Sequence, residues 1–164
     1  MAPGSKILFV GPQGLGALRA APAVGAVIGG LLLTSGAIKK NAGRSLLLAV
    51  AGFGVSILVF SLSSNLILSI IALALSGAFD SVSMVVRSSA VQLSSPDEMR
   101  GRISSVNSMF IGSSNELGEF ESGIVASAIG VVEAAVLGSV VCLMSVIYVA
   151  FYCKTLRDLD LRAL

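Results

Sequence analysis

Hydrophobic residues fill this chain in long blocks, and the longest block free of charged side chains runs from Ser45 to Phe79. A single helix of that length would be about 52 Å long at about 1.5 Å per residue, whereas the hydrocarbon core of a bilayer is only about 30 Å thick. A polar cluster interrupts the block near its middle: Ser61, Ser63, Ser64 and Asn65. The pattern therefore predicts a hairpin of two membrane-spanning helices.

The whole chain divides into five hydrophobic segments, each long enough to cross a bilayer as a helix. They are residues 15–36, 45–62, 66–87, 103–129 and 134–153. We therefore expect an all-α, multi-pass transmembrane bundle of five spanning helices, with residues 1–14 before it and a tail at residues 154–164. The lipid bilayer is its expected surroundings.

Basic residues fall into three groups that give an independent view of the number of crossings. The groups are Lys39, Lys40 and Arg44; Arg87, Arg100 and Arg102; and Lys154, Arg157 and Arg162, which together hold nine of the eleven lysines and arginines. With five crossings all three groups lie on one side of the membrane, and the opposite turns at 63–65 and 130–133 hold none. Because lysine and arginine accumulate on the cytoplasmic side, we expect the C-terminus in the cytoplasm and the N-terminus outside.

An outside N-terminus followed by an odd number of helices is unusual for a whole membrane protein. Residues 1–14 have the composition of the end of a loop that follows an earlier helix. We therefore expect the chain to be the later part of a larger membrane protein.

The composition excludes several classes of function. Only 12% of the residues are charged, 55% are hydrophobic, and the net charge of +2 provides no basic surface for nucleic acid. The chain contains no histidine, so imidazole metal sites and histidine-based catalytic triads are excluded. Nothing supplies an activated nucleophile, so we expect neither an enzyme nor a cofactor.

Small residues recur every four positions in the first segment, at Ala21, Gly25 and Gly29. In lipid, such a stripe lets two helix backbones approach closely. The stripe has two interpretations: plain close packing against a neighbouring helix, or a hinge that lines a cavity.

A carboxylate at bilayer depth marks the third segment. Inserting an aspartate such as Asp80 at the centre of a membrane helix costs about 2.5–3.5 kcal/mol of free energy, so its side chain should face protein or water rather than lipid. One interpretation is a structural ion pair with Arg44 or Lys40 that locks a cytoplasmic gate, and the other is a site for a proton or a substrate.

The fourth segment is polar on one side and apolar on the other. Asn115, Glu116 and Glu119 fall within an arc of about 100°, and an apolar stripe lies about 120–180° away. The stripe is formed by Phe110, Leu117 and Ile124. Turning the two glutamates toward lipid would cost about 5–7 kcal/mol, so the arc should line a cavity or meet other polar helices. Such a carboxylate pair suits the uptake and release of a proton, although structural hydrogen bonding is the alternative.

Several stretches resemble the major facilitator superfamily. Residues 36–44 resemble a degenerate copy of its loop signature. Both glycines are present, but Lys40 stands where an acidic residue is expected and Asn41 where a basic residue is expected. Residues 77–87, 95–102 and 110–123 resemble more closely the exporter branch that includes the enterobactin exporter. Nearly the whole chain is similar to helices eight to twelve of such a transporter.

The resemblance implies a twelve-helix fold, alternating access and proton-driven export of a small molecule such as a siderophore or a drug across a bacterial inner membrane. It places Asn115, Glu116 and Glu119 along the central cavity. It also implies that a cytoplasmic cluster stabilises the gate: Lys40, Arg44, Asp80, Arg87, Arg100 and Arg102. The N-terminal half of the transporter would be a required partner. The alternative is a non-transporting membrane remnant, or an assembly subunit that needs such a half.

Overall fold

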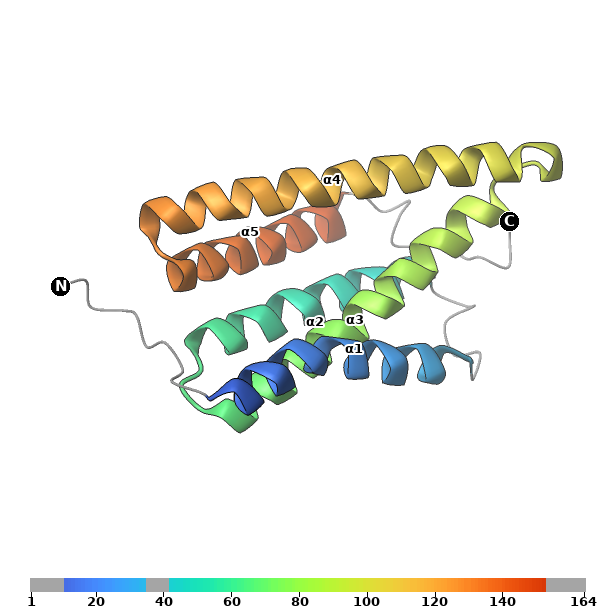
Figure 1. The fold of residues 1–164 in the computed structure, drawn as a ribbon. Coiled ribbons are helices and arrows are strands. Elements are labelled where there is room, and N and C mark those ends of the chain that lie inside the picture. The colour runs from blue at the N-terminus through green and yellow to red at the C-terminus, as the bar shows by residue number, and fades with distance from the viewer. Residues whose placement is uncertain (1–10, 35–41, 153–164) are drawn as a thin grey trace.

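The computed structural model describes residues 11–34 and 42–152, and these form helices without any strand in the described ranges (Figure 1). The helices are α1 (Pro12–Thr34), α2 (Ala42–Leu62), α3 (Leu66–Leu93), the short 3-10 helix η1 (Asp97–Met99), α4 (Arg100–Ile129) and α5 (Val131–Tyr152). The prediction of an all-α fold is therefore confirmed over these residues.

Four of the long helices, as far as the structure describes the chain, have the length and composition to cross a membrane: α1, α2, α3 and α5. The expected fifth crossing, α4, is long enough but too polar to qualify by composition, because its first residue Arg100, Arg102 and three glutamates lie within it. A multi-pass membrane protein is thus supported, whereas the count of five spans is not.

The turn between α2 and α3 lies in the polar cluster at residues 63–65. The side-chain oxygen of Asn65 accepts a hydrogen bond from the backbone N–H of Ile67 at 2.9 Å, which caps the first turn of α3. The N–H of Ser63 donates to the carbonyl of Phe60 at 3.2 Å at the end of α2. These bonds satisfy backbone groups that a helix end leaves unpaired, so the chain can reverse within three residues.

Several helix ends differ from the hydrophobic segments, and the largest difference is at the connection between α3 and α4. The third segment was expected to end at Arg87, but α3 continues to Leu93. The fourth was expected to begin at residue 103, but α4 begins at Arg100. The interval between them contains Pro96, whose ring disfavours helical geometry in the residue before it. Hydropathy therefore located the expected edge of the bilayer, whereas proline and the local capping bonds set the end of the helix.

The start of α1 also differs from expectation. The helix begins at Pro12, within the residues expected to form a preceding loop. Proline is favoured at the first helical position, because its missing N–H would have no partner there.

The helices pack as a chain of neighbours. Helix α3 lies between α1 and α2, α2 also contacts α5, and α5 contacts α4. Figure 1 shows α4 and α5 side by side above the other three helices. In the described residues α4 meets α3 only around their connection, and none of its residues is buried. One long helix is therefore left largely uncovered.

Small side chains fill the contacts between these helices, and large ones point outward. The buried apolar residues are Ala21, Ala42, Ala49, Ala72 and Val86. Large apolar side chains stay exposed on every long helix, among them Leu32 on α1, Leu48 on α2 and Phe151 on α5. This reversal of the pattern of a water-soluble core is typical of helices that pack within lipid.

Buried serines do not connect the helices. Each of Ser56, Ser76 and Ser139 donates its hydroxyl to a carbonyl three or four residues earlier in its own helix, at 2.7–2.8 Å. A weak contact joins α5 to α2, where the thiol of Cys142 points at the carbonyl of Val50 at 3.9 Å. Packing, rather than hydrogen bonding, therefore holds the helices together.

The turn between α4 and α5 depends on Gly130. Its φ of 105° lies in a region that L-residues with a side chain rarely adopt, and a Cβ there would collide with the carboxylate of Glu133.

We predict that Gly130→Val destabilises the protein by about 1–3 kcal/mol. Thermal unfolding in detergent measures this, with Gly138→Ala in open space as the control. Equal stability of the two variants would contradict the assignment of this turn.

Candidate functional site

The three polar residues Asn115, Glu116 and Glu119 lie in the middle of α4, and all three are exposed. They line none of the three best-formed cavities of the described residues. The part of α4 that approaches α5 is a different face, with Gly118, Ser122 and others turned toward it. The described helices therefore leave the carboxylates of Glu116 and Glu119 without a protein cover.

Glu121, the third glutamate of α4, lies in different surroundings. It lines a cavity of about 710 Å³ between α2, α4 and α5, whose other walls are mostly apolar or small residues. Gly54 of α2 and Gly138 of α5 are among them. Glu116, Glu119 and Glu121 are all exposed, but of the three only Glu121 lines this cavity beside α2 and α5.

The expected pair between Asp80 and Arg44 is not formed. Asp80 is exposed and makes no ion pair with any described residue, Arg44 included. The register of the hairpin is consistent with this: counted from the turn at 63–65, Arg44 lies level with Met84, and Met84 is about one helical turn or 6 Å along α3 from Asp80. The alternative partner Lys40 lies outside the described residues.

The other members of the expected cytoplasmic cluster do not converge on Asp80. The Nε of Arg87 donates to the carbonyl of Ser83 in the same helix at 3.4 Å. Arg102 is exposed on α4. Within the described residues, Arg87 and Arg102 therefore make no ion pair with Asp80.

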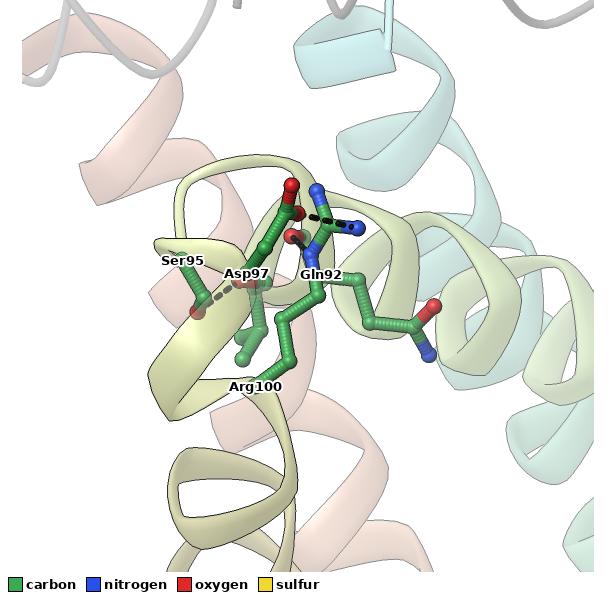
Figure 2. A network of polar contacts seen from close by, with 5 residues as sticks. Gln92, Ser95, Asp97 and Arg100 are labelled. Atoms are coloured by element: carbon green, nitrogen blue, oxygen red, sulfur yellow. Dashed lines mark hydrogen bonds and ion pairs between the residues drawn. The ribbon is translucent and has the colours of Figure 1, made fainter.

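Arg100 holds the corner between α3 and α4 (Figure 2). Its guanidinium pairs with the carboxylate of Asp97 at 2.8 Å and donates through Nε to the carbonyl of Gln92 at 3.1 Å. Ser95 donates its hydroxyl to the carbonyl of Val91 at 2.5 Å. A cation at the C-terminal end of α3 also complements the helix dipole, so Arg100 is a structural residue of this corner.

The small residues of α1 lie against α3. Ala21 is buried, and a Cβ added at Gly25 would overlap the backbone carbonyl of Ala74. A Cβ at Gly29 would come within 2.5 Å of the hydroxyl of Ser81. Of the two interpretations of this stripe, close helix packing is the one that these contacts favour.

The partner surface on α3 was missed from the sequence. Gly77 of α3 belongs to this surface, because a Cβ there would collide with the carbonyl of Pro22 on α1. A signal was available, because Ala74, Gly77, Ala78 and Ser81 form a second stripe of small residues at helical spacing. Two such stripes in one chain are candidates for a common interface.

No metal centre is apparent within the described residues, where no three metal-ligating side chains come together. The arrangement offers instead a pair of uncovered carboxylates on one long helix of a membrane bundle. Such a feature suits a lining of a polar pathway rather than a catalytic centre.

Comparison with known proteins identifies a family. A family model described as transmembrane secretion effector (MFS_3), of the major facilitator type, matches residues 6–163. No curated protein and no solved structure matches the chain.

Proposed function

Since the chain belongs to the family of transmembrane secretion effectors, we propose that it forms part of a secondary active efflux transporter that exports a small molecule, such as a siderophore or a drug, in exchange for protons. The observation that carries the proposal is the pair of glutamates on α4, Glu116 and Glu119, which the described helices leave uncovered. Carboxylates at this depth are tolerated where they line water or meet other polar helices. Asn115 belongs to the same pathway.

We also propose that α4 crosses the bilayer as the fifth spanning helix. It packs along α5, which has the composition of a spanning helix, so α4 shares its depth in the membrane. Its polarity is consistent with a helix that faces a pathway on one side. With this crossing the three basic groups lie in the cytoplasm of a bacterial cell, with the N-terminus outside the inner membrane.

The cytoplasmic cluster of Lys40, Arg44, Asp80, Arg87, Arg100 and Arg102 is proposed to stabilise the closed cytoplasmic side of the pathway. Asp80 makes no ion pair with a described residue, and its contact with Arg44 is proposed to form in another conformation of the transport cycle. The pathway of a transporter lies between its two repeats, so the remaining wall is proposed to come from an N-terminal half. A membrane remnant or assembly subunit is the alternative.

Reconstitution tests the proposal. The chain is placed in proteoliposomes alone, and also together with the N-terminal half of a full-length member of the family. After a pH jump, efflux of the dye ethidium and of a catecholate siderophore is followed. We expect no flux from the chain alone and pH-driven flux of at least one probe with the half present. Absence of flux in both preparations would favour the remnant.

A further inference from the structure

A second groove lies at the opposite end of α4 from the Gly130 turn. It has a volume of about 470 Å³ and runs between the end of α3, at Val91, and the first three turns of α4. Its walls are mostly apolar, with Met99 at the end of η1 and Ile103, Val106 and Phe110 along α4. From Met99 to Phe110 the groove extends for about 16 Å along the helix, which is roughly the thickness of one leaflet of a bilayer's hydrocarbon core.

Arg102 lies at one end of this groove, and Asn107 lines it further along. The two arginines at the start of α4 differ in their surroundings. Arg100 is held by Asp97 and by the carbonyl of Gln92, whereas Arg102 is exposed and makes no ion pair with another residue in the described ranges. The guanidinium of Arg102 is therefore the cation that remains available to an external anion.

The groove also lies on the apolar side of α4. Phe110 belongs to the stripe about 120–180° around the helix from Glu116 and Glu119. If those glutamates face a polar pathway, the side that carries Phe110 faces the lipid. The end that carries Arg102 belongs to the side of the membrane with the basic groups, where anionic lipids attract arginine and lysine.

From these features we propose that the groove binds an anionic phospholipid of the cytoplasmic leaflet. The phosphate pairs with Arg102, whose planar guanidinium offers two parallel N–H donors, and one acyl chain lies along Val106 and Phe110. The site rests on the membrane orientation proposed above, but not on transport activity.

Lipid titration of the detergent-purified protein, followed by native mass spectrometry, tests the proposal. The probes are phosphatidylglycerol and phosphatidylcholine with identical acyl chains. We expect the protein to prefer phosphatidylglycerol about tenfold, and Arg102→Gln to abolish that preference while Arg102→Lys keeps part of it. Phe110→Ala should weaken the binding of both lipids. The controls are Arg19→Gln, on α1, and Phe120→Ala, on α4 outside the groove. Phe110 and Phe120 are matched in exposure, at 70% and 69%.

Three results would overturn the proposal. One is an unchanged preference for phosphatidylglycerol in Arg102→Gln, provided that the variant elutes as a folded protein with wild-type helix content. Another is an equal loss of binding in Phe120→Ala, which would indicate adhesion of lipid along the whole helix. The third is displacement of phosphatidylglycerol by millimolar inorganic phosphate, which would assign the site to a free anion. None of these readouts depends on efflux, so the failure of the lipid site and the failure of the transporter assignment remain distinguishable.

Discussion

Gly77→Leu is expected to separate α1 from α3 and to destabilise the protein by about 3 kcal/mol, the upper end of the usual range for overpacking. The reason is that even the first side-chain atom at this position meets the backbone of α1, at the carbonyl of Pro22, instead of a movable side chain. Backbone cannot rotate out of the way, so the helices must move apart. By the scale of soluble domains of this size, the midpoint of thermal unfolding should fall by roughly 10 °C.

Gly30→Leu is the matched control for this prediction. Gly30 lies in α1 beside the stripe, and a Cβ there meets nothing within 4 Å. The same change of size should therefore be tolerated at Gly30. Circular dichroism in detergent during a thermal ramp gives both midpoints. If Gly30→Leu lowered the midpoint as much as Gly77→Leu, the close contact between α1 and α3 would not be the source of the effect.

Glu116→Gln and Glu119→Gln are each expected to reduce pH-driven efflux by at least tenfold in the reconstituted two-half preparation. Glutamine keeps the size and the hydrogen-bonding capacity of glutamate but cannot bind and release a proton. The exchange of substrate across the membrane at equal pH on both sides should survive, because that reaction needs the pathway but no net proton transfer. Tracer counterflow and pH-jump efflux, measured on the same vesicles, separate the two activities.

Glu121→Gln provides the control within the same helix. Glu121 carries the same charge but lines the cavity between α2, α4 and α5 instead of the uncovered face. Its replacement should leave both counterflow and pH-driven efflux close to those of the unmodified protein. Loss of pH-driven efflux in all three variants alike would show that the total charge of α4 matters, not the face on which Glu116 and Glu119 lie.

The sequence predicted the type of fold and the position of the first hairpin. The uncharged run from Ser45 to Phe79 is too long for one crossing, and the only polar cluster within it gave the turn, where Asn65 caps α3. Such reasoning succeeds because the thickness of the bilayer is known in advance. The ends of the helices were predicted less accurately, since α3 continues past Arg87 to Leu93. The length of a hydrophobic segment indicates how much of a helix lies in the hydrocarbon core, whereas the helix itself ends where its backbone hydrogen bonds end.

The contacts between helices were harder to predict. Gly25 and Gly29 indicated that α1 closely approaches another helix. They did not indicate that Gly77 of α3 forms part of the opposing surface. Spacing along one helix gives the face of a residue, but which other face it meets depends on tertiary packing. The same limit applies to Asp80 and Arg44, because their separation depends on how the hairpin aligns its two arms.

For Glu116 and Glu119 the sequence predicted the face and the structure adds the degree of exposure. Helical periodicity is enough to group the two carboxylates with Asn115 on one side of α4. It does not reveal that α4 packs mainly against α5 and has no buried residue. That information comes only from the arrangement of the other helices.

The serine hydroxyls that bond within their own helices have a mechanical consequence. The hydroxyls of Ser56, Ser76 and Ser139 are used within their own helices, and among the described residues no hydrogen bond joins α1 to α3. The facing stripes of small residues on α1 and α3 can therefore shift along each other without breaking a hydrogen bond, so no donor or acceptor is left unpaired in hydrocarbon. The energetic barrier to a small sliding movement of α1 on α3 is therefore set by the packing of small side chains and backbone, as at Gly25 and Gly77.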